Sequence, residues 1–68
     1  MSTSKYQAYW YSVDGVELNQ PPILLKCSMT ASLVLASRIT GGNLLQLQNN
    51  HYWALLEVNE YTRLLVSR

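Results

Sequence analysis

Charged residues are scarce in this sequence. Asp, Glu, Lys and Arg make up 13% of its 68 residues, against about 25% in an ordinary globular domain. The formal net charge is only +1. Proteins that bind by neutralising phosphates normally carry a strongly basic patch, so this balance argues against nucleic acid as the main partner.

Cysteine and histidine occur once each, as Cys27 and His51. A lone cysteine excludes an intrachain disulfide, and these two residues cannot complete a tetrahedral zinc site. We therefore expect no metal and no cofactor. The core of a domain of this size contributes only about 3–5 kcal/mol to the free energy of unfolding, so small domains are usually stabilised further by disulfides, metals or oligomerisation. Of these supports, oligomerisation remains.

Neither a secretory leader nor a membrane span is predicted. Residues 1–6 contain no apolar segment of the leader type. The longest apolar run, residues 33–36, is far too short to cross a bilayer. A single cysteine fits a reducing compartment. We therefore expect a cytoplasmic protein without membrane contact.

No set of residues has the spacing of a catalytic site. The acidic residues are Asp14, Glu17, Glu57 and Glu60. None of them stands where it would orient His51 as a general base, so His51 is interpreted as a solvated residue at a loop end. Cys27 is interpreted as a small buried hydrophobe. Gly41-Gly42 follows a predicted helix, whereas a phosphate-binding loop precedes one. We do not expect an enzyme.

The first half of the chain predicts a hairpin and a short edge strand. Residues 5–13 are rich in Tyr and Trp, which favour strands. Asp14-Gly15 is typical of a type I′ turn, with a return through residues 16–18. Pro21-Pro22 interrupts that return, and residues 23–25 resume it. Alternation along the first strand places Tyr6, Ala8 and Trp10 on one face and Tyr9, Tyr11 and Val13 on the other.

The best helix candidate covers residues 29–40. Ser28 can cap its start and Gly41-Gly42 can end it. The predicted apolar stripe consists of Met29, Leu33, Leu35, Ala36 and Ile39. Ser32 interrupts this stripe, and a strand competes because residues 31, 33 and 35 also alternate.

Three further strands are predicted at residues 43–48, 51–58 and 61–67, joined by turns at Asn49-Asn50 and Asn59-Glu60. In the first of these strands, alternation puts Leu45 and Leu47 on one face and Leu44 on the other. In the last two strands, it separates one set of alternate residues (Tyr52, Ala54, Leu56 and Val58; Thr62, Leu64 and Val66) from the other set (Trp53, Leu55 and Glu57; Tyr61, Arg63 and Leu65). A helix over residues 43–56 is the alternative. The resulting order is ββαβββ, a single α+β domain over residues 1–68 with one helix on a mostly antiparallel sheet and residues 1–4 disordered.

The aromatic residues are the one group in the sequence that indicates a function. One short helix cannot cover both faces of the predicted sheet, so some rings should meet a partner. The predicted partner-binding residues are Tyr9, Trp10, Tyr11, Tyr52 and Trp53. We expect a small protein-binding module of adaptor or inhibitor type, which binds another protein or forms a homodimer. The alternative is a single-stranded RNA or DNA binder that stacks bases on sheet aromatics. In its length, its lack of catalytic residues and its aromatic surface the chain resembles small inhibitors and adaptors encoded by phages and other mobile elements, although no motif matches.

Overall fold

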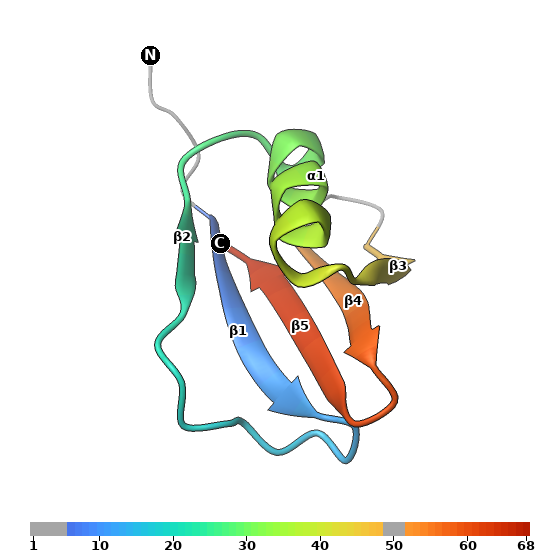
Figure 1. The fold of residues 1–68 in the computed structure, drawn as a ribbon. Coiled ribbons are helices and arrows are strands. Elements are labelled where there is room, and N and C mark those ends of the chain that lie inside the picture. Colours follow the sequence, from blue (N-terminus) through green and yellow to red (C-terminus); the bar gives the residue numbers. More distant parts are fainter. Residues whose placement is uncertain (1–5, 49–51) are drawn as a thin grey trace.

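One helix lies across one face of a five-stranded antiparallel sheet in the computed structural model, which describes residues 6–48 and 52–68 (Figure 1). The predicted α+β class and the order ββαβββ are confirmed. The elements are β1 (Tyr6–Ser12), β2 (Ile23–Leu25), α1 (Met29–Thr40), β3 (Asn43–Leu47), β4 (Trp53–Asn59) and β5 (Thr62–Ser67). The predicted turn at residues 49–50 and His51 lie outside the described residues.

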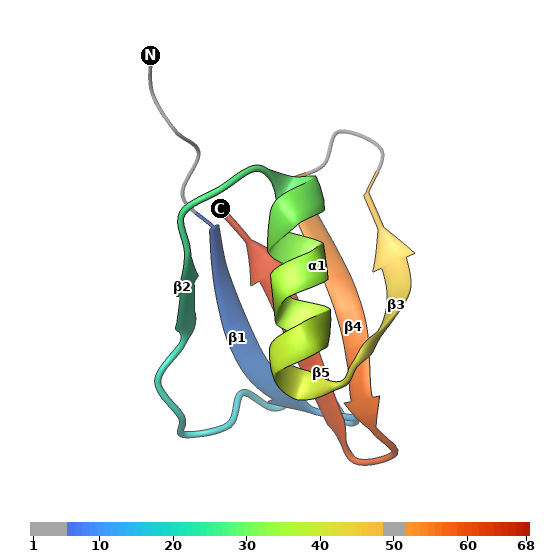
Figure 2. The same ribbon diagram turned by 45° about the horizontal axis from the view of Figure 1, so that its top comes forward.

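The strands follow the order β2-β1-β5-β4-β3, so the first and the last strand lie side by side in the middle of the sheet. β5 pairs with β1 on one side and with β4 on the other. β2 and β3 form the two edges, and α1 crosses the sheet between them (Figure 2). The helix alternative for residues 43–56 is wrong, since β3 and β4 pair in this stretch.

Both ends of α1 follow from local chemistry. The Ser28 hydroxyl accepts a hydrogen bond from the Ala31 N–H at 3.3 Å, which satisfies one of the free donors of the first turn. Gly41 ends the helix with a φ of 74°, and its N–H donates to the Ser37 carbonyl at 2.7 Å. Gly42 is pressed against β4, where a Cβ would lie 2.9 Å from the Glu57 carbonyl oxygen. The predicted bounds of the helix are confirmed.

The side of α1 that faces the sheet differs in part from the predicted stripe. Met29, Ser32 and Ala36 are buried, whereas Leu35 and Ile39 are exposed. The apolar pattern was misleading because small residues, not large ones, let the helix approach the sheet closely. Ser32 is fully buried, and its hydroxyl lies 3.3 Å from the sulfur of Cys27, so one of the two donates to the other.

The core lies between α1 and the sheet. It combines small and large side chains from every element except β3: Tyr6, Ala8, Leu25, Met29, Ala36, Ala54, Leu56, Leu64 and Val66. Trp10, Ile23, Cys27, Leu33 and Val58 pack against this cluster. The predicted alternation of β1, β4 and β5 is confirmed, because one set of alternate residues in each strand enters this core.

The turn after β1 is not the predicted type I′ turn centred on Asp14-Gly15. The Gly15 N–H donates to the Ser12 carbonyl at 3.0 Å, and the Ser12 N–H donates to the Val16 carbonyl at 2.8 Å. Gly15 has a φ of 86°. This is the pattern of a three-residue loop, in which a tight turn precedes a left-handed glycine. The return is short, with a single bridge between Tyr11 and Glu17.

The predicted faces of β3 are also wrong. Leu44 lies opposite Leu56 and Leu47 lies opposite Ala54, so both leucines belong to the helix side of the sheet. The register shifts between Leu44 and Gln46, which leaves Leu45 as an extra residue. A bulge changes which residues share a face, and strict alternation cannot anticipate it.

Candidate protein-binding surface

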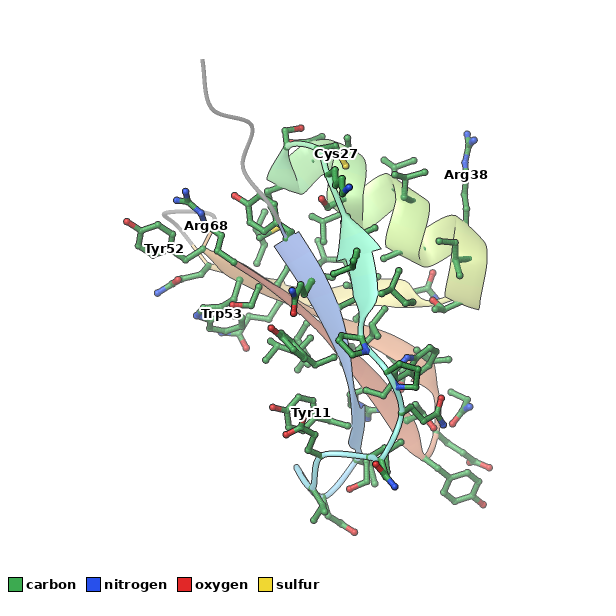
Figure 3. All side chains as sticks on the ribbon, turned by 90° about the vertical axis from the view of Figure 1, so that its left-hand side faces the viewer. Tyr11, Cys27, Arg38, Tyr52, Trp53 and Arg68 are labelled. Atoms are coloured by element: carbon green, nitrogen blue, oxygen red, sulfur yellow. The ribbon has the colours of Figure 1, made fainter. Side chains whose placement is uncertain are left out.

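The side of the sheet opposite α1 carries large apolar side chains, and we call it the open face. It presents alternate residues of the three inner strands: Gln7, Tyr9 and Tyr11 of β1, Trp53, Leu55 and Glu57 of β4, and Arg63, Leu65 and Ser67 of β5. Every one of these residues is half-buried. No described helix or strand packs on this face, and the labelled Tyr11 and Trp53 point away from the helix (Figure 3).

The centre of the open face is apolar. Tyr9 lies opposite Leu65, and Leu65 lies opposite Leu55 on the next strand. Cross-strand pairs of aromatic and branched side chains stabilise a sheet. These contacts therefore support the inner strands although no second layer packs on this face. The Tyr9 hydroxyl donates to the Gln7 side-chain oxygen at 2.7 Å, so its polar end is held on the surface.

One end of the open face holds an ion pair. Arg63 lies beside Tyr11 on β1 and Glu57 on β4. Its guanidinium is 3.6 Å from the Glu57 carboxylate and also donates to the Asn59 carbonyl at 2.9 Å. The opposite charges neutralise each other, and the backbone contact fixes the arginine. This end therefore adds polarity to the open face without adding net charge.

A shallow hollow opens on the face beside this ion pair. It has a volume of about 360 Å³ and lies between Tyr11, Leu55 and Leu65. Val13 and Gly15 of the first turn form its rim. A hollow of this size accepts one or two side chains of a partner, and such pockets are where interface hot spots gather.

Three of the predicted partner-binding residues, Tyr9, Tyr11 and Trp53, share the open face, with Tyr11 and Trp53 towards its opposite ends. Trp10 points to the other side of the sheet and packs against the core, so it does not belong to the open face. Tyr52 immediately precedes β4 and is 53% exposed. The Arg68 guanidinium lies 5.7 Å from the centre of its ring, a cation–π contact at the edge of the surface (Figure 3).

Leu55 and Leu65 were not among the predicted binding residues. The signal for them was present, since alternation groups Leu55 with Trp53 and Leu65 with Arg63. The predicted binding set contains aromatic residues alone. Leucines that alternate with core residues along a strand must also lie on the face away from the core.

Cys27 and His51 are the two residues whose chemical role was considered in the sequence. Cys27 is half-buried next to Ser32, which agrees with its interpretation as a core residue. His51 lies outside the described residues, so its interpretation stays a prediction. Within residues 6–48 and 52–68, no group of three or more His, Cys, Asp or Glu side chains is placed to hold a metal ion.

α1, the one helix among the described residues, is neither long nor apolar enough to cross a membrane. The sequence matches no known family. No curated protein and no solved structure is significantly similar to the chain.

Proposed function

We propose that this protein is a non-enzymatic protein-binding module, of adaptor or inhibitor type, which acts through the open face. The observation that carries the proposal is the row of half-buried rings and leucines on a sheet face that no described element covers. Tyr and Trp are favoured at interface centres because they bring large contact area at a small cost in side-chain entropy. The single free Cys27 supports a cytoplasmic setting.

A second copy of the chain is the simplest partner for this face. Two sheets can stack about 10 Å apart with their side chains interdigitated. The centre of the open face is uncharged, and its one arginine is paired with Glu57. Two copies can therefore meet around a twofold axis without bringing unpaired like charges together.

The expected strength follows from the area that is still exposed. About a third or less of each large apolar side chain is still exposed, and burying this part contributes about 0.5 kcal/mol. Tyr9, Tyr11, Trp53, Leu55 and Leu65 of both subunits then contribute about 5 kcal/mol in total. The cost of association is of the same order, about 4–15 kcal/mol. Loss of two rings should therefore abolish the dimer at micromolar concentration.

Sedimentation velocity at micromolar concentration tests the proposal. The wild type should sediment as a dimer, and the double variant Tyr9→Ser/Tyr11→Ser should be monomeric with an unchanged circular dichroism spectrum. The matched control is Leu35→Ser/Ile39→Ser, because both residues are exposed on the outer side of α1. It should remain dimeric. A dimer that survives loss of both tyrosines removes the open face as the contact surface.

The alternative partner is single-stranded RNA or DNA. The contact of Arg68 with the Tyr52 ring favours it, since an arginine beside an exposed ring is a common stacking site. The paired state of Arg63 weighs against it. Titration of Trp10 and Trp53 fluorescence with mixed oligonucleotides decides between them, because quenching that weakens with salt indicates nucleic acid.

A further inference from the structure

The β3 edge of the sheet is an open strand beside an apolar groove. β3 pairs with β4 on one side, and no described strand pairs with its other side. The groove lies between β3 and α1, has a volume of about 320 Å³, and is lined by Leu33, Val34, Leu44 and Leu56 with Ser37 and Arg38. Leu44 and Val34 are each about half exposed, at 50% and 49%.

The opposite edge of the sheet is protected in the ways that proteins commonly use. β2 has only three residues, follows Pro21-Pro22 and precedes Lys26. Short length, proline and lysine all hinder the addition of another strand. β3 has five residues and contains neither a charge nor a proline. A further strand can therefore add at β3 more readily than at β2.

One charged residue lines the groove. Arg38 stands in the last turn of α1 and is exposed. Among the described residues, no carboxylate forms an ion pair with it, and the one ion pair they contain, between Arg63 and Glu57, lies on the far face of the sheet. An occupant of the groove that carries a carboxylate would therefore find an unneutralised guanidinium at its wall.

We propose that the β3 edge and the α1–β3 groove bind an extended peptide segment of another protein by strand addition. The segment becomes a sixth strand beside β3. Its main chain pairs with the free edge, alternate apolar side chains enter the groove between Val34 and Leu44, and an acidic residue reaches Arg38. Strand addition gains affinity from the main chain and specificity from such side-chain pockets.

A second copy of this chain fits the same edge less well. Two β3 strands paired around a twofold axis would offer only the uncharged residues Asn43–Leu47 to the groove, so Arg38 would meet no carboxylate. The bulge at Leu45 also disturbs the straight edge that two rigid sheets need. A peptide can follow a twisted edge because it has no fixed shape of its own.

Selection from a random decapeptide library displayed on phage tests the proposal with a defined probe. The folded full-length protein serves as bait, and the Val34→Glu variant removes peptides that bind elsewhere. The selected sequences should alternate apolar residues and contain an Asp or Glu. A synthetic peptide of the selected sequence should lose at least tenfold in affinity when alternate amide nitrogens are methylated, because methylation removes the donors that pair with β3.

Two pairs of variants locate the binding site. Val34→Glu should abolish binding, whereas Leu35→Glu, at the next position and outside the groove, should leave it unchanged. Arg38→Glu should weaken an acidic peptide by roughly tenfold, as expected for reversing one exposed ion pair. Ile39→Glu is its neighbouring control. Circular dichroism confirms that all four variants fold.

Three results overturn the proposal. The first is a selection that yields no peptide able to distinguish the wild type from Val34→Glu. The second is binding that tolerates amide methylation. The third is a change of oligomeric state on Val34→Glu or Arg38→Glu, which would make a second copy the occupant. The outcome is independent of the open face, since the double variant Tyr9→Ser/Tyr11→Ser should bind the peptide as the wild type does.

Discussion

The two tryptophans provide a matched test of the two faces of the sheet. Trp10 packs against the core on the helix side, whereas Trp53 lies on the open face. Both are half-buried, so exposure alone does not separate them. Truncating a core aromatic residue costs about 3–5 kcal/mol. Because Trp10 is only partly enclosed, we expect Trp10→Ala to lower the free energy of unfolding by about 2–4 kcal/mol.

Trp53→Ala should behave differently. Trp53 belongs neither to the core nor to the residues that pack against it, and it lies opposite the small polar Ser67. We expect a loss of about 1 kcal/mol, which is typical of a cross-strand contact on an uncovered sheet face. The total stability of a domain of this size is about 3–5 kcal/mol, so Trp10→Ala should retain a free energy of unfolding of only about 1 kcal/mol, whereas Trp53→Ala should retain most of the wild-type value.

Urea denaturation followed by circular dichroism measures both values. It has to be done at a concentration low enough to keep the wild type monomeric, because dimer formation would add to the apparent stability. Equal losses in the two variants, or a larger loss for Trp53→Ala, would refute the assignment of the faces.

The remaining predictions concern α1 and the ion pair. Ser28→Ala should lower the free energy of unfolding by about 1 kcal/mol, because the Ala31 N–H loses its cap; Ser28→Asp should restore it, and no difference between the two would contradict the capping role. Gly42→Ala should cost about 1–3 kcal/mol in the same urea assay, since the new Cβ would lie 2.9 Å from the Glu57 carbonyl oxygen. A neutral result there would mean that the helix end shifts freely against β4. Glu57→Gln should change stability by less than about 0.5 kcal/mol, because its side chain is 42% exposed and ion pairs in contact with solvent contribute little; a larger loss would show a structural role for the ion pair.

The features that sequence predicted well are those set by local chemistry. Ser28 and Gly41 mark the ends of α1 because a cap and a left-handed glycine act within one helical turn. Alternation separated the two faces of β1, β4 and β5 correctly because the side-chain period of a strand is fixed. It grouped Tyr9 with Tyr11 and Trp53 with Leu55, and the structure shows that these groups lie on the side away from the core.

The features that it missed depend on tertiary packing. The exposed Leu35 and Ile39 look like core residues until Ser32 and Ala36 are seen to bring α1 close to the sheet. The bulge at Leu45 is a property of the pairing between β3 and β4, and a single strand does not show it. Trp10 and Tyr11 are neighbours of similar size, and only the position of the helix decides which of them enters the core.

Chemical-shift changes on dilution test the central claim most directly. Spectra of ¹⁵N-labelled protein with ¹³C-labelled leucine methyl groups, recorded from the millimolar to the low micromolar range, report which residues leave a contact as the dimer dissociates. The open face predicts changes at Leu55, Leu65 and the Trp53 indole, with none at Leu35 or at the Trp10 indole. Spectra that do not depend on concentration, or changes that follow the outer side of α1, would contradict the account.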